Sequence, residues 1–172
     1  DPGSAPAALA PATAAMLSKA RDTLERALRI RQLIFDVDSA AALSAQEALA
    51  RLLGGAALRD WLHSEPLFRS VLDLRCEALG PAHPRVLATA LSYVRMLLAH
   101  GRTATASNFL GKHRARVQEA EAAPLSLSAS AACVSKEAAL ALIDQLLKAA
   151  SDQEEAAKAA SAASAASSGL PC

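Results

Sequence analysis

The sequence is poor in aromatic, β-branched and turn-forming residues. Aromatic residues make up 3% of its 172 residues, and it has 7 glycines and 8 prolines. A β-sandwich needs strands rich in Val, Ile and aromatic side chains and a turn roughly every ten residues. The shortage of both strand formers and turn formers excludes a β-rich fold.

The sequence also has almost no net charge and few cysteines. Lys and Arg number 18 and Asp and Glu number 17, so the formal net charge is +1. This balance provides no overall field that would draw the chain to nucleic acid or to an anionic membrane. Cys76, Cys133 and Cys172 are widely spaced and form no C-x-x-C pair, which argues against a disulfide framework or a thiolate metal site. We expect reduced cysteines in a reducing compartment.

No segment has the pattern of a membrane span or a signal peptide. The longest apolar run, residues 86–99, is short for a span and contains Arg95. The first 15 residues include three prolines and an acidic residue where a signal peptide has a basic region. We therefore expect a cytoplasmic protein without membrane insertion.

Helix formers, in contrast, are abundant. Alanine is about a quarter of the sequence, far above ordinary usage, and it has the highest helix propensity. From residue 16 onward apolar residues recur at steps of three and four, which is typical of amphipathic helices. The fold class is therefore predicted to be all-α, with helices over residues 16–35, 40–53, 58–79, 85–100, 103–122 and 134–150.

Short breaks separate the predicted helices. Residues 36–39 supply N-cap side chains for the second helix, and Gly54 with Gly55 ends it. Residues 80–84, with the sequence GPAHP, form a firm break, because Gly80 permits a positive φ and two prolines prevent continuation of the helix. Pro66 is expected to bend the third helix or to shift its start.

The helices repeat with a period just above 40 residues. Residues 24–31 align with residues 68–75 at an offset of 44, and Phe68 aligns with Leu110 at an offset of 42. Two helices per repeat with this period are typical of an α-solenoid.

Residues 65–86, EPLFRSVLDLRCEALGPAHPRV, resemble the tetratricopeptide repeats (TPRs) of the kinesin light chain type. Those repeats carry an E-P-L-Y-x-x-A-L-x-I-R run followed by L-G-x-x-H-P, and residues 79–84 fit that loop. Residues 88–102 are similar to the first helix of the next repeat and its Gly-Arg turn. The resemblance implies an α-solenoid of antiparallel helix hairpins, with about two full repeats and partial flanking units.

We accordingly divide the chain into three segments. Residues 1–12 are predicted to be a Pro/Ala-rich linker, residues 13–150 a TPR-like helical repeat domain, and residues 151–172 an Ala/Ser-rich low-complexity tail or weak terminal helix. The first predicted helix matches a second helix without its first. The helix over 134–150 and a weak helix from Asp152 could form a degenerate hairpin.

The resemblance places partner-binding positions on the groove-facing side of the first helix of each repeat. The family carries paired asparagines there, but this chain has Glu47 with Ala48 and Ser92 with Tyr93, so the asparagine clamp does not carry over. The candidate groove residues are Ser44, Glu47, Arg51, Thr89, Ser92, Tyr93 and Met96. Trp61 is interpreted as a core residue or, alternatively, as an exposed anchor for a partner.

No constellation of residues suggests catalysis, a metal site or a cofactor. None of the four histidines pairs with another ligand at metal-binding spacing, and no Gly-rich phosphate loop is present. His83 belongs to the loop pattern and is expected to order the turn. The basic clusters around residues 21–31 and 112–116 are interpreted as solvated helix faces or salt-bridge surfaces, because nucleic-acid binding would want neighbouring aromatic residues for stacking.

The leading functional hypothesis is a protein–protein interaction module or scaffold segment of a larger protein. It would bind a partner peptide or protein on the concave face of a TPR-like solenoid, without enzymatic activity and without nucleic acid. The alternative is a structural spacer buried in a larger assembly. A cytoskeletal or ciliary assembly is suggested by analogy with the family alone.

Overall fold

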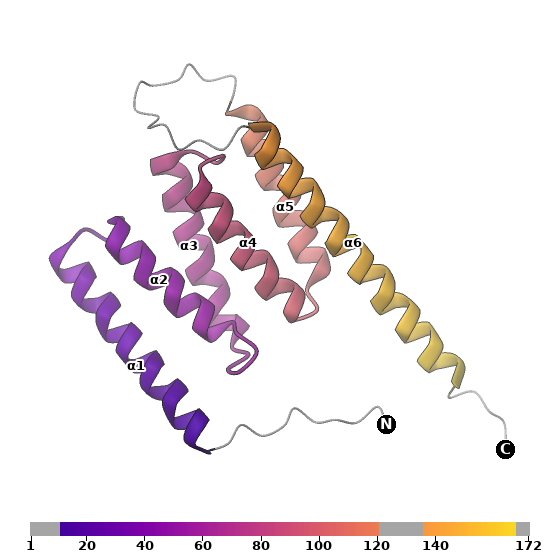
Figure 1. Cartoon of the computed structure of the whole chain (residues 1–172), viewed down its shortest axis with the longest axis horizontal. Helices are drawn as coiled ribbons and strands as arrows, with labels where there is room; N and C mark the ends of the chain where they lie inside the picture. The colour runs from indigo at the N-terminus through magenta and orange to yellow at the C-terminus, as the bar shows by residue number, and fades with distance from the viewer. Residues whose placement is uncertain (1–10, 121–135, 168–172) are drawn as a thin grey trace. The chain divides into compact units, whose positions relative to one another are not determined.

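The computed structural model describes residues 11–120 and 136–167, and these residues form helices without a strand among them (Figure 1). The all-α prediction is therefore confirmed. The chain divides within α3 into two compact units, Asp1–Leu74 and Arg75–Cys172, which are described in turn. The helices are α1 (Pro11–Ile34), α2 (Ala40–Leu53), α3 (Trp61–Leu79), α4 (Pro84–Ala99), α5 (Thr103–Glu119) and α6 (Lys136–Ser167).

In the first unit α1 and α2 lie side by side and run in opposite directions (Figure 1). The bounds of α2 agree with the predicted range, because local caps determine both ends. The Ser39 hydroxyl accepts a hydrogen bond from the Ala42 amide at 3.2 Å, and Gly54 is the C-cap. At the other end of the α1–α2 connection, Arg31 Nη1 donates to the Ala41 carbonyl at 3.0 Å.

Helix α3 begins at Trp61, three residues later than predicted. Arg59 has φ of 52°, a left-handed conformation that cannot continue into a right-handed helix. Pro66 lies inside the helix and not at its first position, so it does not mark the shifted start. Trp61 itself is half-buried. The buried Ser64 hydroxyl donates to the Ala50 carbonyl at 2.7 Å and thereby joins α3 to α2.

The second unit begins at Arg75 in the last part of α3 and continues through the turn between α3 and α4. Gly80 has φ of +87°, which a residue with a side chain rarely adopts, so the expected glycine-dependent break is confirmed. His83 is the N-cap of α4 and its Nδ1 accepts from the Arg85 amide at 3.2 Å. Pro84 follows at the first helical position, where the missing amide proton costs nothing. The ordering role predicted for His83 is confirmed.

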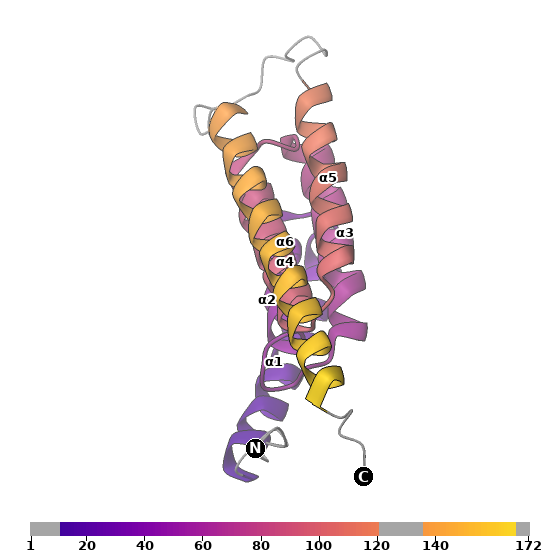
Figure 2. The ribbon, with the colours of Figure 1, turned by 90° about the vertical axis from the view of Figure 1, so that its right-hand side faces the viewer.

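Helix α4 packs on α5, and α5 packs on α6 (Figures 1 and 2). The break expected after residue 150 is absent, because α6 continues as one helix to Ser167, and the degenerate hairpin prediction is therefore wrong. Ala, Glu and Lys favour helix, and Lys158 pairs with Glu154 one turn away at 2.8 Å. The segment between the helices predicted over 103–122 and 134–150 lies outside the described residues.

The buried residues of α2 and α4 occupy equivalent positions. Seven positions of α2 are buried, and the positions that follow them by 44 residues are all buried in α4. The N-caps Ser39 and His83 are also 44 residues apart. The α2 residues are Ala42, Leu43, Ala45, Gln46, Leu49, Ala50 and Leu53, and their α4 counterparts are Val86, Leu87, Thr89, Ala90, Tyr93, Val94 and Leu97.

Helices α3 and α5 share a burial pattern at the predicted offset of 42. The buried residues Ser64, Phe68, Val71 and Arg75 of α3 precede by 42 positions the buried residues Ala106, Leu110, His113 and Val117 of α5. The sequence offsets found in the repeat analysis are therefore also offsets of the buried faces.

Candidate partner-binding surface

The three candidate residues on α2 lie on its outward side. Ser44 and Arg51 are exposed and Glu47 is half-buried. The Ser44 hydroxyl donates to the Ala40 carbonyl at 2.6 Å, so its polar atom is partly occupied by its own helix. Arg51 makes no ion pair within the part of the chain that is described. Its guanidinium can present several donors to a carboxylate or carbonyl of a partner.

Three of the four candidate residues on α4 are buried, which contradicts their expected exposure. Thr89 and Tyr93 are 0% exposed and Met96 is 6% exposed. The Thr89 hydroxyl accepts from the Arg75 guanidinium of α3 and donates to the Arg85 carbonyl at 2.9 Å. These side chains serve the interior of the second unit and cannot contact a partner in this conformation.

Tyr93 is held by an aromatic contact. Its ring meets the ring of Phe109 on α5 edge to face, with centroids 4.9 Å apart and planes at 85°. This geometry is favourable for aromatic quadrupoles. The fourth candidate, Ser92, is half-buried and donates to the Ala88 carbonyl at 3.0 Å.

The outward face of α4 carries residues that the sequence reasoning missed. The position 44 residues after Arg51 is Arg95, which is exposed, and the position 44 after Ser44 is Ala88, also exposed. The sequence alignment of residues 49–53 with residues 94–98 has an offset of 45 and places Arg51 on Met96. The buried faces of α2 and α4 correspond at an offset of 44, which corrects that alignment and places Arg51 on Arg95. The outward faces are therefore defined as Ser44, Glu47, Ala48 and Arg51 on α2, and Ala88, Leu91, Ser92 and Arg95 on α4.

The basic cluster at residues 112–116 is not a solvated face throughout. His113 is 3% exposed and stacks on Phe109, with ring centroids 5.9 Å apart. Its Nε2 is buried and finds no hydrogen-bond partner within the described residues. Arg114 Nε lies 3.4 Å from Asp144 Oδ1, an ion pair that connects α5 to α6.

Burial lowers the pKa of the His113 imidazole, and the charge of Arg116 lowers it further, while a hydrogen bond to the Pro81 backbone acts in the opposite direction. Because Pro81 has no amide proton, the imidazole N–H donates to its carbonyl. The neutral ring thus joins α5 to the turn before α4.

A histidine with a lowered pKa makes stability depend on pH. The unfolded chain binds a proton at the ordinary pKa of about 6.5, whereas the folded chain binds it only at a lower pH, so the free energy of unfolding falls as pH falls below the ordinary value. We expect a loss of up to about 1.4 kcal/mol per pH unit, the limit for one proton. Urea unfolding of the wild type and of His113→Val at neutral and mildly acidic pH measures it. Valine occupies the equivalent position 71, and an equal acid loss in both proteins would contradict the assignment.

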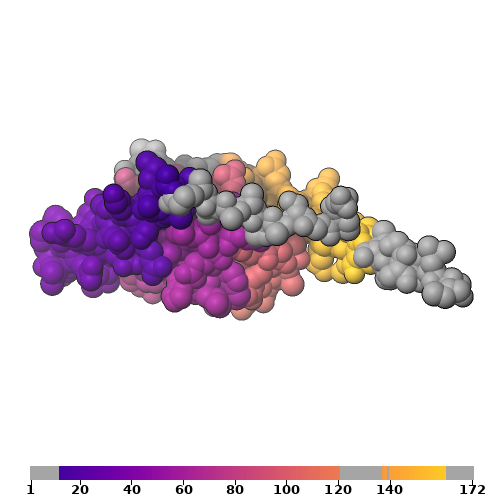
Figure 3. All heavy atoms as spheres, turned by 90° about the horizontal axis from the view of Figure 1, so that it is seen from below, coloured from indigo at the N-terminus to yellow at the C-terminus, as the bar shows by residue number. Residues whose placement is uncertain are grey.

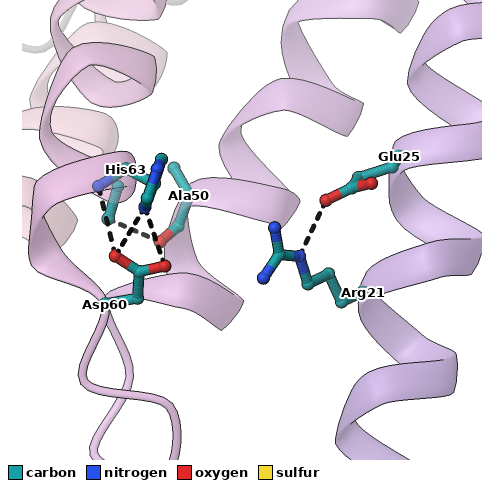
Figure 4. Close-up of polar contacts among 6 residues, drawn as sticks. Arg21, Glu25, Ala50, Asp60 and His63 are labelled. Carbon is teal, nitrogen blue, oxygen red and sulfur yellow. Dashed lines mark hydrogen bonds and ion pairs between the residues drawn. The ribbon is translucent and has the colours of Figure 1, made fainter.

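Two charged groups in the first unit are paired with neighbours on the same helix or at its start (Figure 4). Arg21 Nε donates to Glu25 Oε1 at 2.8 Å. Asp60 accepts from the His63 ring nitrogen at 2.8 Å, and this hydrogen bond lowers the pKa of the Asp60 carboxyl. His63 Nδ1 and the His63 amide both point at the same carboxylate, which caps the start of α3.

The described residues contain no group of three or more His, Cys, Asp or Glu side chains that could hold a metal ion. None of their helices combines the length and hydrophobicity needed to cross a membrane. Cys76 is half-buried and forms no disulfide within the described residues, whereas Cys133 and Cys172 lie outside them.

The chain was compared with protein-family models, with curated proteins and with solved structures. None of the three comparisons finds a match. The resemblance of residues 65–86 to kinesin light chain-type TPRs therefore stays a prediction from the sequence.

Proposed function

We propose that this chain is a protein–protein interaction module, a scaffold segment that binds a partner peptide or protein on a TPR-like α-solenoid. Each unit is assigned its own partner-contacting face: the outward face of α2 in the first unit and the outward face of α4 in the second. The module needs no catalytic group and no cofactor, and it acts in the cytoplasm, where a cytoskeletal assembly is the setting that family analogy favours.

The single observation that carries this proposal is the repeated burial register. Because equivalent positions of α2 and α4 are buried, equivalent positions are also left outward, and each outward face presents one arginine, Arg51 or Arg95. Neither arginine has an ion-pair partner within the described chain. A repeated helix hairpin that presents the same charged side chain is the form in which helical-repeat proteins build extended binding surfaces.

The alternative is a structural spacer within a larger assembly. The observation that favours it is the burial of Tyr93 and Met96, which removes two expected groove anchors. The two functions differ in one respect that can be measured. A spacer would lose nothing when Arg51 and Arg95 are changed, whereas a binding module would lose its partner.

We expect the double variant Arg51→Glu with Arg95→Glu to weaken partner binding by about 2–4 kcal/mol, the range of interface anchors. Both side chains are exposed, so the free energy of unfolding should change by less than about 0.5 kcal/mol per site. Partners captured by the full wild-type chain are quantified by mass spectrometry and then measured with purified protein. Arg69→Glu, an exposed charge reversal on α3, is the matched control. Undiminished binding by a folded double variant would favour the spacer.

A further inference from the structure

Helix α1 corresponds to the second helix of a repeat hairpin and carries the same apolar stripe. One side of that stripe, however, is not covered by another described helix. Ala20 and Ala27 of α1 correspond, at the offset of 44, to Ser64 and Val71 of α3. Ser64 and Val71 are each 0% exposed, whereas Ala20 and Ala27 are only half-buried. Figure 3 shows atoms of α1, in indigo, at the surface of the molecule.

In the other two hairpins this side of the stripe contacts the first helix of the same hairpin. Ser64 of α3 bonds to Ala50 of α2 at 2.7 Å. Phe109 of α5 meets Tyr93 of α4 at 4.9 Å between centroids. The α1 residue equivalent to Phe109 is Thr23, which is exposed. Among the described residues no helix precedes α1, so nothing in them occupies the place that α2 and α4 take.

This open face of α1 is a continuous stripe along the helix. Its residues follow one another at alternating steps of four and three, which keeps them on one side of an α-helix. The end residues Met16 and Ile34 are 72% and 67% exposed, and Ile30 is 46% exposed. The open face consists of Met16, Ala20, Thr23, Ala27, Ile30 and Ile34.

Positive charge borders the open face. At 100° per residue, Lys19 and Arg26 lie on the edge of the open face that points away from α2. Both are exposed, and neither forms an ion pair within the described chain. Arg21, in contrast, is neutralised by Glu25 at 2.8 Å. Asp22 is the only acid near this edge, so the border carries a net positive charge.

We propose that the open face of α1 docks an amphipathic helix of a partner protein, with Ala- and Leu-type side chains at three- and four-residue steps and Glu or Asp along its edge. The repeat indicates that the occupant is a helix, and Lys19 with Arg26 indicates that its border is acidic. A second copy of the chain is disfavoured, because it would bring an equally basic border. The open face of α1 shares no residue with the outward faces of α2 and α4, so this proposal does not depend on the proposed function.

The probes are two hydrocarbon-stapled peptides based on residues 39–55, the first helix of the following hairpin. Both keep its inward Ala and Leu residues. In one peptide Ser44, Ala48 and Arg51 are replaced by Glu, and in the other these positions and Glu47 are replaced by Lys. The staple keeps both peptides helical, so that their affinities differ by charge. Binding to the full chain is measured by fluorescence anisotropy at low and moderate salt.

We expect the acidic peptide to bind about tenfold more tightly than the basic peptide, since two attractive contacts replace two repulsive ones. The variant Ile30→Glu with Ile34→Glu should abolish binding of the acidic peptide. Leu62→Glu, which changes another exposed leucine, 65% exposed on α3, should leave it intact. The variant Lys19→Glu with Arg26→Glu should invert the preference toward the basic peptide.

Three outcomes would overturn the proposal. The first is no binding of either peptide to the folded wild type, and the second is equal binding that is unaffected by Ile30→Glu with Ile34→Glu. The third is a concentration-dependent dimer in analytical ultracentrifugation that the same variant abolishes, which would identify a second copy as the occupant. The Arg51→Glu with Arg95→Glu variant should bind the acidic peptide normally, so failure here and failure of the proposed function are separable.

Discussion

Replacement of Tyr93 by alanine is expected to destabilise the protein by about 3–5 kcal/mol, the range for truncating a buried aromatic side chain. The side chain is 0% exposed and its ring packs edge to face on Phe109. The variant therefore loses buried apolar surface and an aromatic contact, and it leaves a cavity in the core. Urea unfolding followed by circular dichroism measures the change.

Arg95→Ala is the matched control, because it lies on the same helix but faces outward. It should change the free energy of unfolding by no more than about 0.5 kcal/mol. Tyr93→Phe keeps the ring and should lose far less than Tyr93→Ala. If Tyr93→Ala and the wild type unfold at the same urea concentration, the Tyr93 side chain is not part of the core. That result would favour the sequence-based prediction that Tyr93 belongs to a binding surface.

Leu72→Ala is expected to lower the free energy of unfolding by about 2–5 kcal/mol. The chemically identical substitution Leu28→Ala is expected to lower it by about 1 kcal/mol. The two leucines occupy equivalent positions 44 residues apart in α3 and α1. Leu72 is 3% exposed, whereas Leu28 is half-buried, so less apolar surface and a smaller cavity are at stake in α1.

Both substitutions are compared by chemical denaturation of the full chain. Because the change in the side chain is the same, its propensity and transfer free energy cancel, and the difference reports the burial of the two sites. Equal destabilisation would show that the site of Leu28 is as well covered in solution as the site of Leu72.

The positions of the helices were largely predictable because local interactions determine them. The bounds of α2 follow from the Ser39 cap and Gly54, and α4 starts where the His83 cap and Pro84 place it. Helix α6 was the exception. Residues 151–161 are almost all exposed, yet no glycine or proline interrupts the helix before residue 168, so propensity alone carries the helix through the expected break.

The exposed face of α4 was not predictable to the same degree. The apolar spacing of this helix predicts a stripe of Leu87, Leu91, Val94, Leu97 and Leu98, with Tyr93 and Met96 outside it. Leu87, Val94 and Leu97 are buried and Leu91 and Leu98 are half-buried, but Tyr93 and Met96 are buried as well. The helix is contacted by α3 through Thr89 and by α5 through Tyr93, so its buried arc is wider than one stripe. His113 is also buried, although the basic cluster at residues 112–116 is predicted from the sequence to be a solvated face.

Local signals in the sequence establish that the described residues are helical, where most helices begin and end, and that their pattern recurs at 44 and then 42 residues. These properties depend on propensity, caps and periodicity, which act over a few residues. Which copies of the pattern are buried depends instead on tertiary packing. Ala27 and Val71 occupy the same position of the repeat, but their exposure differs because burial depends on the neighbouring helix that each one meets.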